Sequence, residues 1–238
     1  MKKNIGIVFA DGMEYSPFLA FAKERNGKEF SLRGNDAVTI TMTEGDRELE
    51  ITGVKCGIGK VNAASATSFL ISDKSAHFIL NAGLSGAVHS LKREDMVAGE
   101  SYVECDYDLT AIGYGLGVKP DGQNYIYHAD EKLLGYALES QGIKKAKTGT
   151  GDIFLTDSSK KKLFFDTFGV EAFDMETAAI ASVCDKCNIP MLSLRKISDD
   201  ADDCSVDDYR EMNEREEACL TQLLENILKR LLKDSSQW

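Results

Sequence analysis

An alternation of short apolar runs with helical patterns constrains the fold of this chain more than any other feature. Residues 4–9, 77–81 and 191–197 are short and rich in apolar side chains, which is typical of buried strands. Helical patterns follow at 14–23 and 60–71. Strands that alternate with helices favour a parallel sheet with helices on both faces. The sequence therefore predicts an α/β fold, a three-layer sandwich in which helices flank a central, mainly parallel mixed sheet.

Further elements extend this pattern along the chain. We expect additional strands at 37–43, 48–56, 95–104, 145–149 and 171–173, and additional helices at 131–141, 175–186 and 208–232. The glycine-bearing residues 82–87 and 106–123 are expected to be loops. In the last helix, leucine and isoleucine recur at three- and four-residue steps, so one face should pack on the core. We expect one domain over residues 1–238.

Composition and charge exclude several classes of partner. The chain has 39 acidic and 28 basic residues, a net charge of −11. An acidic surface of this size repels nucleic-acid phosphates and anionic membranes, and no run approaches the roughly 18 apolar residues of a membrane span. The apolar run after the Met-Lys-Lys start is interrupted by Asp11 and Glu14 before it reaches the length of a signal peptide. We therefore expect a cytoplasmic protein with neither nucleic acid nor membrane as partner.

Cysteines and histidines predict neither a disulfide framework nor a metal site. The six cysteines are scattered and are expected to be reduced thiols. Cys184 and Cys187 have the spacing of a redox motif, but they fall late in a helical pattern, which favours a packing role. The three histidines, His77, His89 and His128, lack metal-ligand spacing.

Polar residues collect where four predicted strands end. They are Asp11 and Glu14 after the first strand, Ser85 within 84–86 after a central strand, Asp152 close to the aromatic Phe154 after a third, and Ser198 and Asp199 after a fourth. The carboxyl ends of parallel strands lie at one edge of the sheet, where ligands bind in folds of this type. The sequence therefore predicts one composite pocket at that edge.

Three motifs each have a structural and a functional interpretation. Gly57 and Gly59, within the segment 56–64, form either a packing turn or a ligand edge, without the full pattern of a dinucleotide fingerprint or a P-loop. Asp174 and Glu176 lie at a strand-to-helix junction, where the helix dipole favours carboxylates, but Glu176 is also placed to accept hydrogen bonds from a ribose diol. Ser198 and Asp199 form either a solvated acidic loop or a proton donor whose pKa is raised by burial.

In this order and spacing, the segments resemble the 5′-methylthioadenosine/S-adenosylhomocysteine nucleosidases of the nucleoside phosphorylase superfamily. The similarity runs from residue 4 to about residue 209. No single motif is diagnostic, but the combination is specific. The motifs that carry it are the opening strand with Met13-Glu14, GIGKVNAA at 57–64, NAGLSG at 81–86, YDLTAIGY at 107–114, GDIF at 151–154, DME at 174–176 and RKISD at 195–199.

The resemblance implies a role for each matching residue. Glu14 would activate the attacking water with Arg195 nearby, and Asp199, oriented by Ser198, would protonate the leaving adenine. Glu176 would hold the ribose hydroxyls. The other residues implied to bind substrate are Met175 under the sugar, Phe154 and the backbone of Leu155 at the base, Ser85 and Gly86 in the glycine loop, and Ile58, Leu109, Ile112 and Tyr114 around the 5′-thio group, some of them from a second subunit. The resemblance also implies a homodimer with a small nucleoside substrate and no cofactor or metal.

The implied reaction is hydrolysis of the N-glycosidic bond of 5′-methylthioadenosine, S-adenosylhomocysteine or a related 5′-substituted adenosine, which releases adenine and the 5-thioribose product. An oxocarbenium-like sugar needs a protonated leaving base and a positioned water, which these carboxylates would supply. Three residues depart from the family pattern: Leu84 replaces a usual serine, Ile112 replaces a common aromatic, and Val206 lies near another expected aromatic. They leave the preferred 5′-substituent open among methylthio, homocysteinyl, deoxy and futalosine-type groups.

Two other functions and one alternative base stay open. A purine nucleoside phosphorylase would bind phosphate through an arginine and a serine near the glycine loop, where this chain has Asn81 and Leu84. A non-catalytic nucleoside-binding protein would fit a chain that lacks Glu14 or Asp199, but both are present. Asp11 is the alternative to Glu14 as the base, because Gly12 leaves the direction of the loop open.

Overall fold

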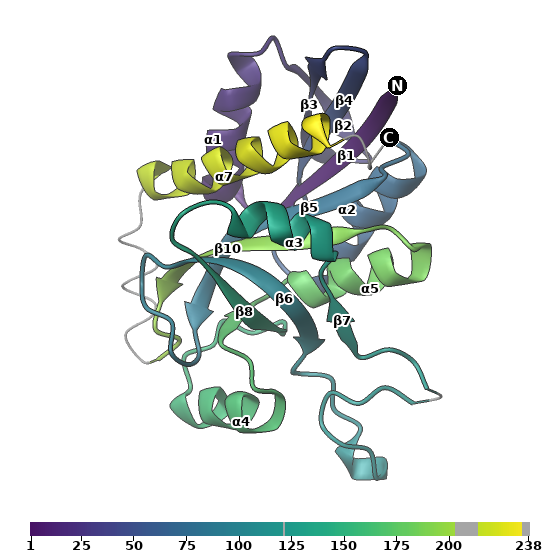
Figure 1. Ribbon diagram of the computed structural model, residues 1–238. Helices are drawn as coiled ribbons and strands as arrows, with labels where there is room; N and C mark the ends of the chain where they lie inside the picture. Colours follow the sequence, from purple (N-terminus) through teal and green to yellow (C-terminus); the bar gives the residue numbers. More distant parts are fainter. Residues whose placement is uncertain (121, 203–213, 235–238) are drawn as a thin grey trace.

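A ten-stranded mixed sheet forms the centre of the computed structural model, which describes residues 1–120, 122–202 and 214–234 (Figure 1). The strands are β1 (Lys2–Phe9), β2 (Lys28–Leu32), β3 (Asn35–Glu44), β4 (Arg47–Lys55), β5 (Phe78–Ala87), β6 (Met96–Glu104), β7 (Ile126–His128), β8 (Ile143–Thr150), β9 (Ala172–Asp174) and β10 (Met191–Asp199). The helices are α1 (Gly12–Lys23), α2 (Lys60–Ser72), α3 (Glu131–Leu138), α4 (Ser158–Phe168), α5 (Thr177–Cys187) and α7 (Glu214–Lys233), with the 3-10 turn η1 (Thr110–Ile112).

The long strand β5 organises the sheet, because it changes neighbours along its length. Its first half is parallel to β1, most of its length is parallel to β10, and its end pairs with the short strand β9. From β9 the order continues through β8 and β6 back to β10, so these five strands close into a ring. The strands β4, β3 and β2 extend the sheet beyond β1. The α/β fold class is confirmed, and the closure of the ring is an addition that the strand pattern alone did not predict.

Helices cover both faces of the sheet. In Figure 1, α1, α3 and α7 lie on the near face, and α2 and α5 lie on the far face. Helix α7 contributes seven buried apolar residues to the main core, as its spacing predicted: Leu220, Leu223, Leu224, Ile227, Leu228, Leu231 and Leu232. Residues 208–213 of the predicted last helix lie outside the described residues. The expectation of one domain over residues 1–238 stays a prediction.

The clearest error of the sequence interpretation concerns residues 82–87, which were expected to be a loop. They form the second half of β5, paired in parallel with β10 from Ala82 to Gly86. Glycine usually marks a turn, but at Gly83 a Cβ atom would collide with the carboxylate of Glu14 and the guanidinium of Arg195. The glycine therefore serves close packing inside a strand, and the strand brings this segment to the site directly.

Two strands and one α-helix were not predicted from the sequence. The strands β2 and β7 are short, and the sequence of β2, KEFSL, carries two charges. Helix α4 has a recognisable start, since the side chain of Asp157 accepts hydrogen bonds from the backbone N–H groups of Ser159 and Lys160. Its left-handed end at Gly169 is an equally ordinary stop signal.

Two sequence expectations about cysteines and membranes can be compared with the described residues. Cys56, Cys105, Cys184, Cys187 and Cys219 are free thiols. Of the helices that the structure describes, none combines the length and the apolar character needed to span a membrane.

Candidate functional site

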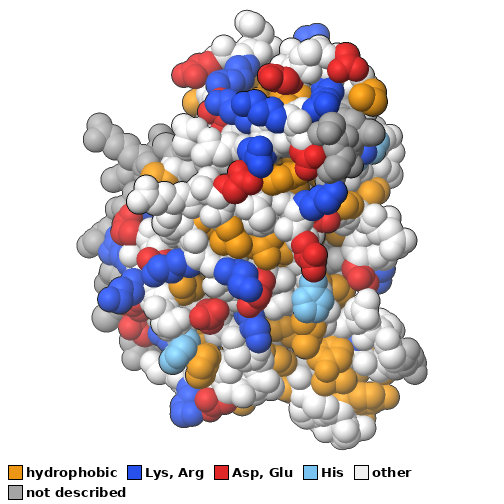
Figure 2. All heavy atoms as spheres, in the orientation of Figure 1, with side chains coloured by type: hydrophobic (Ala, Val, Ile, Leu, Met, Phe, Trp, Pro, Cys, Tyr) orange, Lys and Arg blue, Asp and Glu red, His pale blue; other side chains and the backbone are white. Residues whose placement is uncertain are grey.

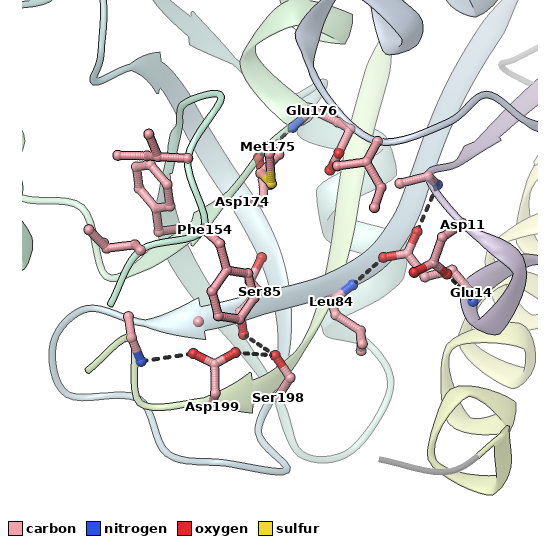
Figure 3. Close-up of a pocket in the computed structure, with 17 residues that line it drawn as sticks. Asp11, Glu14, Leu84, Ser85, Phe154, Asp174, Met175, Glu176, Ser198 and Asp199 are labelled. Atoms are coloured by element: carbon pink, nitrogen blue, oxygen red, sulfur yellow. Dashed lines mark hydrogen bonds between the residues drawn. The ribbon is translucent and has the colours of Figure 1, made fainter. Parts of the chain in front are cut away.

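A cavity of about 310 Å³ opens at the carboxyl ends of β1, β5, β8, β9 and β10 (Figure 3). It lies at the edge of the sheet where the polar strand ends were expected to meet. Its described walls are Ala10, Asp11, Glu14, Ile58, Leu84, Ser85, Gly86, Ile153, Phe154, Leu155, Phe173, Asp174, Met175, Glu176, Ser198, Asp199 and Ala201.

Glu14 lies in the first turn of α1, and both oxygens of its carboxylate accept hydrogen bonds from the backbone. The N–H of Ala10 donates to Oε2 at 2.7 Å, and the N–H of Leu84 donates to Oε1 at 2.8 Å. Burial raises the pKa of Glu14 to about 8, although the charge of Arg195 opposes the shift. A carboxyl group with a near-neutral pKa is suited to accept a proton from water.

Asp11, the alternative base, has a different task in this geometry. It is the N-cap of α1, and its Oδ1 accepts a hydrogen bond from the N–H of Glu14 at 3.1 Å. An N-cap aspartate stabilises the start of a helix. The capping bond therefore holds the first turn that carries Glu14, while both residues line the cavity.

Arg195 lies beneath the cavity and is completely buried. Its Nη2 is 3.0 Å from Asp174 Oδ2 and donates to Asn81 Oδ1 at 2.5 Å and to Thr177 Oγ1 at 2.7 Å. A buried guanidinium needs such a partner, because an unpaired buried charge is costly. Asp174 is therefore the counter-ion of Arg195. The sequence interpretation noted Asp174 in its motif but gave it no role in the site.

Glu176 faces the cavity at the start of α5, and its carboxylate is buried. Its Oε1 accepts a hydrogen bond from the N–H of Gly59 at 2.9 Å, and its Oε2 lies 3.9 Å from Nη2 of Arg195. Burial raises the pKa of Glu176 to about 7, and the nearby Asp174 also favours the protonated form. With one oxygen held by Gly59, the group presents a hydrogen-bonding edge to the cavity.

Asp199 ends β10 on the other side of the cavity (Figure 3). The Ser198 hydroxyl donates to Asp199 Oδ2 at 2.6 Å, and the N–H of Ala201 donates to Oδ1 at 2.9 Å. A Cβ atom on Gly86 would lie 2.8 Å from Asp199 Oδ1, so only glycine leaves room for this carboxylate. Asp199 is thus fixed in direction by two donors, and it lies at the opposite end of the cavity from Glu14.

Apolar side chains form the rest of the cavity wall. Phe154 is 44% exposed and Ile58 is 53% exposed, so both stand at the mouth of the cavity. Leu155 is buried, and Met175 lies beside Glu176 in Figure 3. An apolar cavity with a few directed polar groups is the usual form of a small-molecule site.

Four of the predicted site residues are not part of these walls. Arg195 lies behind them, as described above. Leu109, Ile112 and Tyr114 belong to the segment that leaves β6, and the described cavity walls do not include them. Val206 lies outside the described residues. Among the residues that the structure describes, no group of three or more histidine, cysteine or acidic side chains is arranged to hold a metal ion.

Comparisons with known proteins agree with one another. Residues 4–229 match the family model of the phosphorylase superfamily. The 5′-methylthioadenosine/S-adenosylhomocysteine nucleosidase of Bacillus subtilis is 34% identical over 202 residues, which are 80% of this chain and 86% of the relative. The aminodeoxyfutalosine nucleosidase of Campylobacter jejuni is 34% identical over 160 residues, 65% of this chain and 69% of the relative. The crystal structure of Helicobacter pylori 5′-methylthioadenosine/S-adenosylhomocysteine nucleosidase superposes with a TM-score of 0.88 at 26% identity and covers 96% of this chain and 99% of that chain.

Proposed function

Because the chain belongs to the phosphorylase superfamily, we propose that it hydrolyses the N-glycosidic bond of 5′-methylthioadenosine, S-adenosylhomocysteine or a related 5′-substituted adenosine. Adenine and the 5-substituted ribose are the products. The observation that carries the proposal is the convergence of Glu14, Glu176 and Asp199 on one apolar cavity from three different strand ends. The named relatives are nucleosidases, and the structure of a mutant of the Helicobacter pylori enzyme holds 5′-methylthioadenosine in its active site.

In the proposed mechanism Glu14 takes a proton from the attacking water. Its pKa of about 8 suits this step near neutral pH, because a base works best when its pKa is close to the working pH. The backbone donors on Glu14 hold the carboxylate in place while the water moves to the anomeric carbon. Such fixed geometry removes much of the entropic barrier to the attack.

Asp199 supplies the proton for the leaving base. Its position at the opposite end of the cavity from Glu14 keeps the acid and the base apart. The Ser198 hydroxyl and the Ala201 N–H hold its two oxygens in a fixed direction. Glu176 accepts hydrogen bonds from the ribose hydroxyls, Met175 packs under the sugar, and Phe154 stacks on the adenine. Backbone groups of Leu155 and of the 85–86 segment complete the contacts to the base.

A phosphorylase is less consistent with the geometry at Arg195. Phosphate binding needs a cation whose donors point at the ligand. The guanidinium of Arg195 is instead buried and engaged by Asp174, Asn81 and Thr177. Leu84, which replaces the usual serine, adds an apolar side chain at the wall beside Glu14. Water is therefore the better nucleophile for this site.

A second copy of the chain completes the site in this proposal. Ile112 and Tyr114 are 70% and 39% exposed, and Ile58 and Phe154 leave apolar surface at the cavity mouth. Figure 2 shows apolar side chains gathered at the lower right, over β7 and the segment that follows β6. Exposed apolar surface of this kind favours association. In a symmetric dimer, Leu109, Ile112 and Tyr114 would reach the 5′-group in the partner's cavity. Cytoplasmic location stays a prediction from the sequence.

One assay tests the reaction. The protein is incubated with 5′-methylthioadenosine, with and without phosphate, and free adenine and the sugar product are separated by chromatography. We expect adenine and methylthioribose at a rate that phosphate does not change. A sugar phosphate that forms only in the presence of phosphate would identify a phosphorylase. Binding of the nucleoside without any release of adenine would identify a non-catalytic binding protein.

Light scattering at the assay concentration tests the dimer, and a fully active monomer would contradict it.

A further inference from the structure

Three loops around the cavity meet at a cluster of charged groups that the proposed mechanism does not use. One loop joins β4 to α2 and carries Ile58, one joins β8 to α4 and carries Phe154, and the third is the segment that leaves β6. Lys60, Asp106 and Asp152 connect the three loops, and we call these three residues the polar junction. The first two loops carry the residues of the cavity mouth. The third leads to Leu109, Ile112 and Tyr114, which are predicted to reach a partner's cavity.

Hydrogen bonds link the polar junction into a closed ring. Nζ of Lys60 donates to Asp106 Oδ1 at 2.8 Å. The backbone N–H of Asp152 donates to Asp106 Oδ2 at 2.9 Å. The ring closes where the backbone N–H of Lys60 donates to Asp152 Oδ1 at 2.8 Å. Because every loop is tied to the other two, displacement of one of them strains the remaining bonds.

The polar junction is joined directly to the ribose carboxylate of the proposed site. Gly59 precedes Lys60, and its N–H donates to Glu176 Oε1 at 2.9 Å. The start of α2 thus holds two carboxylates, Glu176 and Asp152, on neighbouring N–H groups, which is an arrangement that a helix N-terminus favours. A shift of Lys60 would carry the Gly59 donor with it, and a misplacement of ~1 Å is enough to impair a catalytic site.

The positive charge of Lys60 does not stabilise helix α2. A cation in the first turn of a helix is opposed by the helix dipole. The side chain is nevertheless largely covered, 20% exposed, between Glu104 and Asp106. Burial lowers the pKa of this lysine, but hydrogen bonds and charge from Asp106 and Glu104 outweigh burial and raise it above the usual value. Lys119 also pairs with Glu104, at 2.5 Å. Removal of the Lys60 charge would therefore change the pairing of Asp106 more than that of Glu104.

We propose that Lys60, held by Asp106 and Asp152, is a positioning residue of this enzyme, which directs Glu176 toward the ribose hydroxyls. The proposal rests on the function proposed above. In this proposal the glycine-rich segment at 57–60 is more than a packing turn. Its backbone orients the Glu176 carboxylate, and Lys60 keeps that backbone in place.

The test compares two substitutions of Lys60 with a matched control. Lys60→Met removes the charge and keeps the length, and Lys60→Arg keeps the charge. The control, Lys55→Met, removes a lysine at the end of β4 that pairs with Asp36 at 2.6 Å. The measured quantity is the ratio of kcat/KM for 5′-methylthioadenosine to that for its 2′-deoxy analogue. We expect Lys60→Met to lower this preference about tenfold, the scale of one charge-assisted hydrogen bond. Lys60→Arg should restore it to within about twofold of wild type, and Lys55→Met should leave it unchanged.

A double-mutant cycle separates positioning from general stability. If Lys60 acts through Glu176, Lys60→Met should change the 2′-hydroxyl preference little in a Glu176→Gln background. An equal loss in both backgrounds, or an unchanged preference in Lys60→Met alone, would overturn the proposal. If Lys60→Met fails to fold, Asp152→Asn is measured in the same way. This variant keeps the shape of the Asp152 side chain but makes it a weaker acceptor for the Lys60 N–H. An unchanged 2′-hydroxyl preference in Asp152→Asn would overturn the proposal.

Failure of the proposed function gives a different result. A wild-type protein that releases no adenine contradicts hydrolysis, whatever Lys60 does. The positioning role is then measured by the thermal stabilisation that adenosine and 2′-deoxyadenosine give to wild type and to Lys60→Met. Loss of the difference between the two nucleosides in the variant supports the role, and an unchanged difference contradicts it.

Discussion

The floor of the cavity and its mouth are built in opposite ways. On the floor, Glu14, Glu176 and Asp199 are buried, and each carboxylate accepts at least one backbone N–H. At the mouth, Ile58 and Phe154 are about half exposed apolar side chains. The three floor carboxylates are therefore held by groups of one chain, whereas the two mouth residues keep about half of their apolar surface exposed.

This difference separates the two parts of the proposed activity. Proton transfer and bond cleavage depend on directed groups whose geometry the fold already fixes. Selection of the 5′-substituent depends on apolar contact, which a second subunit would supply. Substitutions on the floor should therefore change turnover, and substitutions at the mouth should change substrate preference.

The largest effect is expected for Glu14→Gln. The amide keeps the shape of the side chain but cannot take a proton from water, so we expect adenine release to fall by at least ~10³-fold, within the range of general-base catalysis. Chromatographic measurement of adenine checks this. A nucleoside analogue should still raise the melting temperature of the variant.

Asp11→Asn is the matched control for Glu14→Gln. Asparagine also caps helices, so the first turn of α1 should persist. We expect this variant to keep at least about a tenth of wild-type turnover, because a cap contributes to structure and does not accept the proton. If the two variants behave the other way round, the water is activated by Asp11 and the role given to Glu14 is wrong.

Asp199→Asn should have the next largest effect. We expect turnover to fall by ~10²–10³-fold, because the leaving adenine loses its proton donor. Binding of the nucleoside should change little, because asparagine has nearly the same shape and the Ser198 and Ala201 donors hold the side chain in the same direction. Steady-state kinetics with 5′-methylthioadenosine provide the measurement. Turnover above a tenth of wild type would remove Asp199 from the mechanism.

Asp174→Asn should move the pH profile and leave the chemistry intact. In wild type, kcat/KM should decline as the pH falls below about 8, because Glu14 must be ionised to act as base. Asp174 balances the charge of Arg195, and Arg195 lowers the pKa of Glu14. With Asp174 neutral, the unbalanced guanidinium should lower the pKa of Glu14 further, and the acidic limb should shift to lower pH by about one unit.

The control for Asp174→Asn is Asp166→Asn on the exposed face of α4. This variant removes an equal charge far from the floor and should leave the acidic limb in place. An acidic limb that is unchanged in both variants would mean that Asp174 only fixes the backbone at the start of α5, since its Oδ1 also accepts the N–H groups of Glu176 and Thr177.

The sequence predicted the floor of the site better than the long-range contacts behind it. Glu14 and Asp199 follow directly from the rule that ligands bind at the carboxyl ends of parallel strands, and local pattern is enough to find such ends. The role of Asp174 depends on Arg195, which comes from another strand, and no spacing rule joins the two. The same limit explains residues 82–87, because the pairing of β5 with β10 becomes visible only when the two strands lie side by side.

Substitution of a residue predicted to contact the 5′-group tests whether the cavity mouth controls substrate preference. We expect Ile112→Ala to raise KM for 5′-methylthioadenosine about fivefold, because one lost apolar contact in a pocket is worth ~1 kcal/mol, and to leave KM for adenosine nearly unchanged. The kcat of the variant should stay close to wild type. Leu138→Ala, an exposed position at the end of α3, is the control. Equal changes with both substrates would show that Ile112 stabilises the protein or its dimer and does not contact the 5′-group.

The smallest effect is expected at Leu84, an apolar residue that belongs to the floor. Its N–H donates to Glu14 and its carbonyl accepts from Arg195, so both bonds are made by the backbone and survive a change of side chain. The side chain itself lines the cavity and is 8% exposed. We infer that it keeps water away from Glu14, and burial is the largest cause of the raised pKa of that group.

Leu84→Ser should therefore lower the pKa of Glu14, because a hydroxyl beside the carboxylate favours the charged form. We expect the acidic limb of kcat/KM to shift down by about half a pH unit, with a change in kcat of less than about threefold at neutral pH. Leu84→Ala removes the same bulk without adding a hydroxyl. A larger shift with serine than with alanine would assign the effect to the hydroxyl, whereas equal shifts would assign it to water that enters the space. No shift in either variant would mean that the fold, and not this side chain, keeps Glu14 dry.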